Sequence, residues 1–287
     1  MNPGRIFLLL SALFFTGITG CGLLRGQYGY NEKVGRYYLV RGIEMYTEVY
    51  GKGKPLLMIH GNGGNMNAFS MTVPYFEKEY KVILVDSRAQ GRTVDNGDSL
   101  SFEMMADDFD ALLKAMHIKA AYVLGWSDGG INALELAMRH PNRVIKLAST
   151  GANLWPDSLG LRPDVWLDGV RDYKSWQTRM PLTDATDKND YKIFMLDYMQ
   201  PNIPLSDLKK IHCPALIIGG DNDLIPVKHT TQIAENIPNG RLWIVPNSGH
   251  ATLKEHSTDF NKKVDDFFKE PYHRKRKERL ADDDPDL

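Results

Sequence analysis

A serine between two glycines is the first candidate for chemistry. The segment Gly125-Trp126-Ser127-Asp128-Gly129 has the pattern G-x-S-x-G, with an apolar run before it and a helical stretch after it. In that context the serine hydroxyl projects from a sharp strand-to-helix turn, where the helix N-terminus stabilises developing negative charge. A glycine-rich turn with a serine N-cap would explain the same five residues, so the assignment depends on partners elsewhere in the chain.

A base and an acid follow two later apolar runs. Serine becomes a good nucleophile when a histidine removes its proton and a carboxylate orients that histidine. We expect the base to be His250, which lies between an apolar run and the last helix, whereas His256 is expected to be a surface residue. We expect the acid to be Asp223, which ends Gly220-Asp221-Asn222-Asp223, with Asp221 as the alternative. The chain order is then Ser127, Asp223, His250.

An oxyanion needs donors, and a glycine-rich loop offers one of them. His60-Gly61-Asn62-Gly63-Gly64 directly follows an apolar run. In strand–turn–helix sites of this kind, one backbone amide comes from the residue after the nucleophile and the other from such an early loop. We therefore expect the amides of Asn62 and Asp128 to form the oxyanion hole and His60 to hold the loop; a flexible glycine turn is the alternative. The side chains of Asp128 and Trp126 are candidates for substrate contact.

The elements that must position these residues alternate along the chain. Apolar, β-rich runs predict strands at 37–40, 44–50, 55–59, 81–85, 121–125, 144–148, 215–219 and 242–245. Helical spacing or position predicts helices at about 101–116, 129–140, 227–236 and 258–269. Such alternation predicts an α/β fold, with a mostly parallel twisted sheet and helices on both faces.

The region from 152 to 208 breaks this alternation. It is rich in Asp, Trp, Tyr and Pro and has no clear strands, which predicts a cap inserted over the strand ends. Its aromatic side chains would either line an apolar pocket or form the cap's own small core. The core of the fold is then expected in two parts, 36–151 and 209–270, followed by a charged, disordered tail at 271–287.

The N-terminus has the features of an export signal. Arg5 precedes an apolar run that ends at Ile18-Thr19-Gly20-Cys21, and this tetrapeptide resembles a bacterial lipobox. The resemblance implies a signal peptide at 1–20, lipid on Cys21, a tether at 21–35, and an exported, membrane-anchored protein of the cell envelope. The alternative is an uncleaved anchor or a plain secretory signal, since the uncharged run from Ile6 to Leu24 is just long enough to span a bilayer.

Composition excludes several other classes of protein. The 287 residues carry a formal net charge of −1, with 43% hydrophobic and 25% charged residues, as in a globular domain. This balance gives no electrostatic footprint for nucleic acid. The two cysteines cannot form a disulfide scaffold, and neither a clustered metal-ligand motif nor a phosphate-binding loop occurs, so we expect no metal and no cofactor.

Over about residues 37–270 these motifs resemble the α/β-hydrolase family. The stretches Gly125–Leu134 and Thr150-Gly151-Ala152-Asn153 are most similar to its valacyclovir hydrolase, or biphenyl hydrolase-like, branch. The loop at 86–93 is similar to the family's D-x-R-G-x-G-x-S segment, with Ala89 in place of a glycine. The resemblance implies the α/β-hydrolase fold. In that branch the aspartate after the nucleophile recognises the α-amino group of amino-acid esters, and Asp128 occupies this position; alternatively, its carboxylate only stabilises the helix N-terminus.

We therefore expect a serine hydrolase that cleaves a small ester or related acyl bond through an acyl-enzyme. Acyl transfer to an alcohol and perhydrolysis would use the same three residues. A binding module without catalysis is the alternative from a different class, because a fold does not imply a function. The expected partner is a small-molecule acyl substrate, with the membrane reached through the N-terminal lipid; the sequence does not indicate an oligomeric state.

Overall fold

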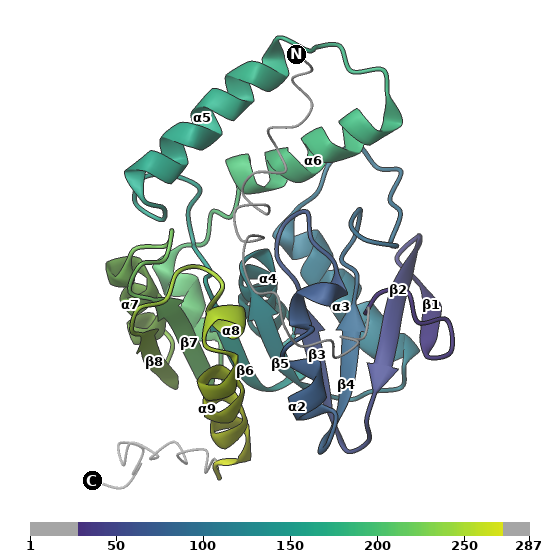
Figure 1. Cartoon of the computed structure of the whole chain (residues 1–287), viewed down its shortest axis with the longest axis vertical. Coiled ribbons are helices and arrows are strands. Elements are labelled where there is room, and N and C mark those ends of the chain that lie inside the picture. The colour runs from purple at the N-terminus through teal and green to yellow at the C-terminus, as the bar shows by residue number, and fades with distance from the viewer. Residues whose placement is uncertain (1–27, 272–287) are drawn as a thin grey trace, which may run out of the picture.

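A single eight-stranded sheet forms the centre of the molecule. The computed structural model describes residues 28–271. Its strands are β1 (Gly35–Val40), β2 (Ile43–Tyr50), β3 (Lys54–Ile59), β4 (Tyr80–Val85), β5 (Ala121–Trp126), β6 (Val144–Thr150), β7 (Ala215–Gly220) and β8 (Gly240–Val245). They lie in the order β1-β2-β4-β3-β5-β6-β7-β8, and all neighbours from β4 to β8 are parallel (Figure 1).

The first hairpin supplies the antiparallel part of the sheet. β1 pairs with β2 and β2 with β4, both antiparallel. The connecting residues Arg41 and Gly42 have φ values of 46° and 83°. Two consecutive positive φ values fit a tight turn whose twist matches that of the strands, which explains the glycine.

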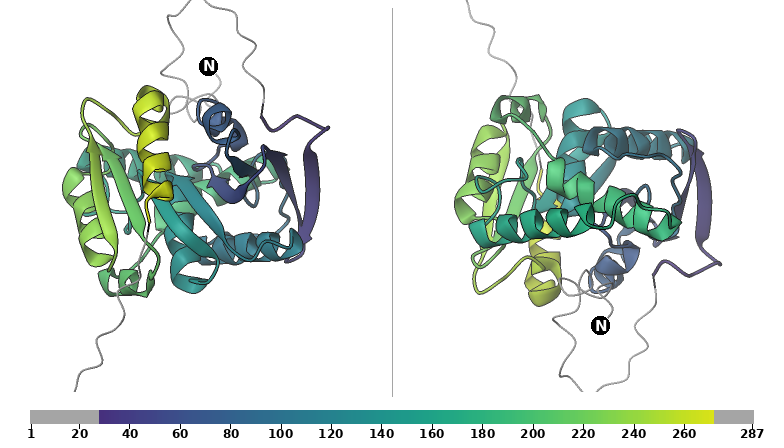
Figure 2. Two further views of the ribbon diagram at one scale, coloured as in Figure 1. Left: turned by 90° about the horizontal axis from the view of Figure 1, so that it is seen from below. Right: turned by 90° about the horizontal axis from the view of Figure 1, so that it is seen from above.

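Helices cover both faces of the sheet (Figure 2). One face packs against α3 (Phe102–Ala115), α4 (Asp128–Arg139) and α7 (Val227–Asn236), and the other against α2 (Val73–Phe76) and α9 (Ser257–Lys269). In β5, Val123 packs in the core on the side of α3, α4 and α7, whereas Tyr122 and Leu124 pack in the core on the side of α2 and α9. This alternation is what a strand buried on both faces requires, and it confirms the predicted architecture.

The predicted cap contains two long helices. α5 (Pro163–Gln177) and α6 (Ala185–Met199) lie above the carboxyl ends of the strands, and η3 (Leu205–Lys210) leads back into β7 (Figure 1). Aromatic rings pack between the helices: Tyr173 stacks on Tyr198 with ring centroids 4.7 Å apart, and Trp176 lies 5.4 Å from Tyr191. These aromatic residues therefore form the small core that holds the two cap helices together.

Short elements complete the fold, and the predicted termini lie outside it. The sequence pattern did not indicate η2 (Met66–Phe69), α2 or α8 (Thr252–Glu255), each of which has only four residues. The lipobox-like segment, Cys21 and nearly all of the charged tail lie outside the described residues. Between residues 28 and 271, no helix combines the length and apolar character needed to cross a membrane.

Candidate active site

Ser127 occupies a strained turn between β5 and α4. Its φ and ψ are 58° and −124°, a conformation that L-residues adopt rarely. The two flanking glycines are required by close backbone packing. A Cβ on Gly125 would overlap the Gly129 carbonyl, and a Cβ on Gly129 would overlap the carbonyl of Ile59 in the neighbouring strand. The G-x-S-x-G pattern is therefore a steric requirement of this turn.

Three side chains predicted from separate motifs meet at the carboxyl ends of the strands. The Nδ1 atom of His250 lies 2.7 Å from Oδ1 of Asp223, and its Nε2 atom lies 2.9 Å from Oγ of Ser127. Because a carboxylate only accepts, Nδ1 carries the ring proton, which leaves Nε2 free to accept from the serine hydroxyl. This is the geometry of a hydroxyl activated by a general base that a buried acid orients.

The loop that carries His250 is fixed from two sides. The indole Nε1 of Trp126 donates to the His250 carbonyl at 2.9 Å, and Lys254 lies over the indole ring, with Nζ 4.9 Å from a ring centroid. A Cβ on Gly151 would come within 2.7 Å of the imidazole Cε1. Trp126 therefore positions the histidine loop through the backbone, in addition to any contact it makes with substrate.

The two alternative residues bind the same loop through its backbone. Oδ1 of Asp221 accepts from the Ser248 amide at 3.1 Å, and Nε2 of His256 lies 3.2 Å from the Asn247 carbonyl. Backbone amides of the loop lower the pKa of Asp221. Neither side chain is bonded to His250 in the described structure, so each has a structural role here.

His60 sets the direction of the oxyanion loop. Its Nε2 atom accepts from the Ser87 amide at 3.1 Å, so Nδ1 carries the proton and donates to the Gly61 carbonyl at 2.7 Å. Burial lowers the pKa of His60, which keeps the ring neutral. In a trans peptide the carbonyl and the next amide point in opposite directions. Fixing the Gly61 carbonyl therefore turns the Asn62 amide away from His60.

Two backbone amides remain available beside Ser127. A Cβ on Gly61 would lie 2.9 Å from that of Ser127, so the oxyanion loop packs directly against the serine. The amide of Asp128 is the first in α4, where helix amides have no intrahelical acceptor. Among the described residues, neither the Asn62 nor the Asp128 amide donates a hydrogen bond. Both can therefore bind an oxygen that carries developing charge.

The Asp128 side chain meets a residue that the sequence did not indicate. Its Oδ2 atom accepts from Nδ2 of Asn62 at 2.8 Å, and its carboxyl lies within hydrogen-bonding distance of Asp197 on α6. Desolvation raises the pKa of Asp128 well above its usual value, and the Asp197 carboxyl raises it further. Asp197 is a polar residue on an accessible cap helix, so only tertiary structure brings it to the site.

A buried ionic network fixes α6 over the core. Nζ of Lys192 lies 2.7 Å from Oδ2 of Asp95, whose other oxygen lies 2.8 Å from Arg88. Arg88 is also bonded to Asp108 on α3 at 2.6 Å. Since these side chains are nearly fully buried, breaking one pair would leave an uncompensated charge. The network therefore holds α6, and with it Asp197, at a defined place.

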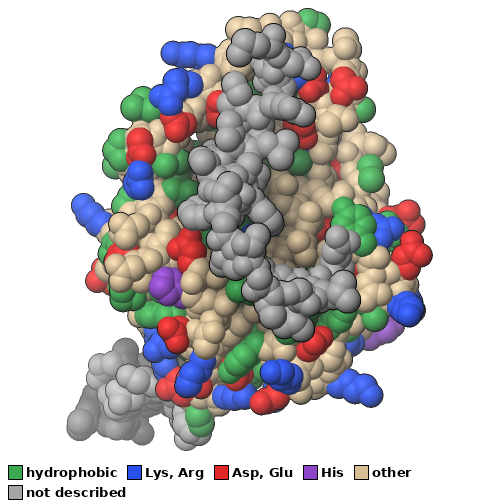
Figure 3. All heavy atoms as spheres, viewed as in Figure 1, with side chains coloured by type: hydrophobic (Ala, Val, Ile, Leu, Met, Phe, Trp, Pro, Cys, Tyr) green, Lys and Arg blue, Asp and Glu red, His purple; other side chains and the backbone are tan. Residues whose placement is uncertain are grey.

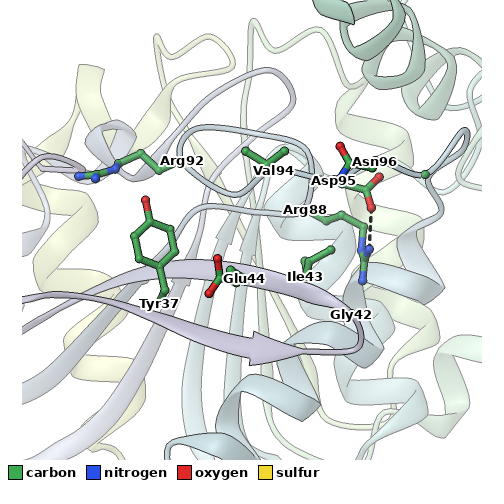
Figure 4. A pocket seen from close by; sticks show the side chains of 10 residues that line it. Tyr37, Gly42, Ile43, Glu44, Arg88, Arg92, Val94, Asp95 and Asn96 are labelled. Carbon is green, nitrogen blue, oxygen red and sulfur yellow. Dashed lines mark hydrogen bonds and ion pairs between the residues drawn. The ribbon is translucent and has the colours of Figure 1, made fainter.

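A cavity of ≈ 500 Å³ lies beside the β1–β2 hairpin, and its lining does not include Ser127, Asp223 or His250. Figure 4 shows that Arg88 and Asp95 point toward one another at its edge, and Arg92 extends away from them. The Arg92 guanidinium lies over the Tyr46 ring, 4.3 Å from its centroid. Both arginines are held by other side chains, so neither presents a free positive charge to the cavity, whose lining also includes the carboxylate of Glu44.

Neither the charges on the face seen in Figure 3 nor the metal-ligating side chains of the described residues suggest a further centre. On the face in Figure 3, basic and acidic side chains are interspersed around the molecule. Within residues 28–271, no three His, Cys, Asp or Glu side chains are grouped as metal ligands would be. The chemically distinctive groups therefore lie together in the site already described: the hydrogen-bonded Ser127, His250 and Asp223, the amides of Asn62 and Asp128, and the Asp128 and Asp197 carboxyls.

Comparison with known proteins identifies the family of this chain. The family described as alpha/beta hydrolase fold matches residues 54–186. "Serine hydrolase BPHL" of Homo sapiens is 30% identical over 248 residues, which cover 79% of this chain and 84% of that protein. "2-hydroxymuconate semialdehyde hydrolase" of Pseudomonas sp. (strain CF600) is 28% identical over 276 residues, which cover 84% and 95%.

Solved structures match the architecture. The enol-lactonase from Burkholderia xenovorans LB400 superposes with a TM-score of 0.69 at 20% identity, over 82% of this chain and 100% of that one. At this identity the likeness concerns the fold alone. Sequence and structure together lead to one conclusion: this chain belongs to the α/β-hydrolase fold family and is a hydrolase.

Proposed function

We propose that this protein is a serine hydrolase that cleaves a small carboxylic ester or a related acyl bond. The observation that carries the proposal is the continuous hydrogen-bonded chain from Ser127 Oγ through His250 to Asp223, with distances of 2.9 and 2.7 Å. Esterases and other hydrolases among the similar proteins support the same class of reaction.

The proposed reaction has two halves. His250 takes the proton of the Ser127 hydroxyl while Oγ attacks the acyl carbon, and the oxyanion forms opposite the amides of Asn62 and Asp128. The imidazolium, stabilised by Asp223, then protonates the leaving alcohol as the acyl–oxygen bond breaks. Water, deprotonated by His250, attacks the acyl-enzyme and releases the acid and the free serine. Losing one oxyanion donor typically lowers the rate about 100- to 1,000-fold.

Asp128 and Trp126 are the proposed substrate contacts. Asp128 is only 2% exposed, and among the described residues no basic side chain forms an ion pair with it. A buried carboxyl without a cationic partner is costly unless a ligand supplies one. This supports recognition of an amino group on the acyl part of the substrate, close to the scissile carbonyl. Trp126, half-buried beside Ser127, would contribute an apolar surface.

Two alternatives use the same site differently. An alcohol or hydrogen peroxide in place of water would make the protein an acyltransferase or a perhydrolase with the same acyl-enzyme. A binding module without catalysis would have no need for an intact hydrogen-bonded triad, and the short Ser127–His250 distance favours the enzyme.

A fluorophosphonate probe tests the proposal. The wild-type protein should be labelled on Ser127, and folded Ser127→Ala should not. A panel of p-nitrophenyl and aminoacyl esters would then define the acyl group. Absence of labelling in a folded wild-type protein would reject the enzyme in favour of the binding module.

We also propose that lipid on Cys21 anchors the enzyme to a membrane outside the cytoplasm. The basis is the lipobox-like sequence that ends at this residue. The folded body begins soon afterwards, where Glu48 accepts from the amides of Gly29 and Asn31 at 2.9 and 2.7 Å. Metabolic labelling with an alkyne fatty acid should mark the wild type and not Cys21→Ala. Equal labelling of both proteins would contradict lipidation at this residue.

A further inference from the structure

The backbone just before His250 is held by a side chain that the proposed reaction does not use. Glu255 is the last residue of α8, and its carboxylate reaches back to the loop that precedes this helix. Its Oε2 atom accepts from the Gly249 amide at 2.6 Å and from the Ser248 hydroxyl at 3.0 Å. In the described part of the chain, these two groups are the hydrogen-bonding partners of the carboxylate. Glu255 therefore binds the loop one residue before the proposed base.

The other contacts of this loop with the turn after β7 end at Ser248. The Asn222 amide donates to the Ser248 carbonyl at 2.9 Å, and Oδ1 of Asp221 accepts from the Ser248 amide at 3.1 Å. The Gly249 amide has Glu255 as its acceptor, and no other acceptor for it lies among the described residues. Because glycine has wide backbone freedom, this bond limits the directions that the chain can take at the residue before the base.

The helix that carries Glu255 is anchored to the residue that also holds the nucleophile. The Ser127 amide donates to the Thr150 carbonyl at 2.8 Å, at the end of β6. The Oγ1 atoms of Thr150 and Thr252 lie 2.8 Å apart, which ties the start of α8 to the same strand end. Thr252 is buried, and Leu253 packs in the core on the side of α2 and α9. The short helix α8 therefore has a defined place relative to Ser127.

We propose that Glu255 is a positioning residue, whose carboxylate keeps Nε2 of His250 within hydrogen-bonding distance of Ser127 Oγ. It does so by fixing the Gly249 amide. Contacts through Thr150 and α8 connect Glu255 to the nucleophile, so nucleophile and base are held in one frame. Such a frame affects the rate, since a displacement of about 1 Å between reacting groups can lower it about 100-fold. This inference rests on the proposed function.

Two substitutions separate the reach of the side chain from its charge. Glu255→Gln removes the charge and keeps an oxygen that can accept from both loop donors. Glu255→Asp keeps the charge and is shorter by one methylene group. With p-nitrophenyl acetate, we expect kcat/KM to fall about 10-fold in Glu255→Asp and at most about 3-fold in Glu255→Gln, mainly through kcat. The control, Asp259→Asn, removes an exposed carboxylate from the first turn of α9 and should behave like the wild type.

A double-mutant cycle tests whether Glu255 acts through His250. His250→Ala should retain weak hydrolysis that depends on the oxyanion hole and on substrate binding. Glu255→Ala should lower kcat/KM about 10-fold in the wild type and leave it unchanged in His250→Ala. A residue that only supports the surface turn would lower both values by the same factor. The urea midpoint of each variant checks that it is folded.

The outcomes separate the two proposals. If the wild type neither hydrolyses p-nitrophenyl acetate nor takes up a fluorophosphonate, the proposed hydrolase function fails, and this inference fails with it. If the wild type hydrolyses the ester but Glu255→Asp is as active as Glu255→Gln, the positioning role alone is overturned. An equal loss from Glu255→Ala with and without the His250 imidazole would also overturn it.

Discussion

His229 should make the junction between core and cap sensitive to acid. This side chain, on α7, is 1% exposed, and its Nε2 atom accepts from the amide of Leu154 at 2.9 Å. The ring also packs edge-on against Trp155, with centroids 4.9 Å apart. Leu154 and Trp155 lie just after β6, where the chain enters the cap. Protonation of His229 would remove the acceptor and place a charge in an apolar environment.

The magnitude follows from the shift in pKa. Desolvation lowers the pKa of His229 from 6.5 to about 4. Between these values the unfolded chain binds a proton that the folded chain does not, so folding stability falls as pH decreases. The contribution is complete above 6.5 and lost as the pH approaches the folded value. At about 1.4 kcal/mol per pKa unit, the full loss is about 3 kcal/mol, of which about 2 kcal/mol is lost by pH ~5.

His229→Gln isolates this contribution, because glutamine can accept the same hydrogen bond and does not titrate. The assay is urea unfolding at pH ~8 and pH ~5, compared as the difference in free energy of unfolding. We expect that difference to be about 2 kcal/mol smaller in His229→Gln than in the wild type. His212→Gln, at an exposed position, serves as the control and should behave like the wild type.

One result would refute the reasoning. If His229→Gln and the wild type lose the same stability between the two pH values, the buried imidazole does not exclude the proton. The Leu154 amide would then have another acceptor in acid.

Three further predictions concern single positions. Ala89 has a φ of 64°, so Ala89→Gly should raise the free energy of unfolding by about 1 kcal/mol. Gly91→Ala should lower the free energy of unfolding, because the added Cβ would overlap the Asp86 carboxyl. Equal effects of the two substitutions in urea unfolding would contradict this prediction. Burial raises the pKa of Glu135 to about 7, so the folded state loses stability as pH rises from 4.5 to 7. Glu135→Gln should therefore stabilise the protein by up to about 3 kcal/mol near pH ~9 and hardly at pH ~4. A stabilisation that does not depend on pH in the same assay would count against this prediction. Trp126→Phe removes the donor to the His250 carbonyl and should lower kcat/KM for ester hydrolysis about 10-fold with little loss of stability. Unchanged kinetics would show that the indole hydrogen bond does not position the histidine loop.

Much of the core could be predicted from the sequence, because its signals are local. Each buried strand is a short apolar run, and each candidate catalytic residue lies within five residues after the end of one. In a parallel sheet, residues after the strands meet at one edge, so separate motifs converge without any knowledge of long-range contacts. The structure brings Ser127, Asp223 and His250 together at that edge.

The cap could be predicted only as an interruption. Its helix α6 lacks the strong apolar face of α3 or α9, since α6 buries Lys192 beside Phe194 and exposes Met199. Ionic contacts with the loop around Asp95 fix α6, and such pairing has no local pattern in the sequence. The Asp128–Asp197 contact was missed for the same reason, because the partners lie on different layers and only the fold brings them together.

The most direct test of the central claim is the site of covalent modification during turnover. The protein should be mixed with a p-nitrophenyl ester, quenched in acid while turnover continues, digested, and mapped by mass spectrometry. We predict one acyl group per active chain, on the peptide that contains Ser127, and none in Ser127→Ala. Ester cleavage that proceeds equally well in Ser127→Ala, with no acyl group on this peptide in the wild type, would contradict the account.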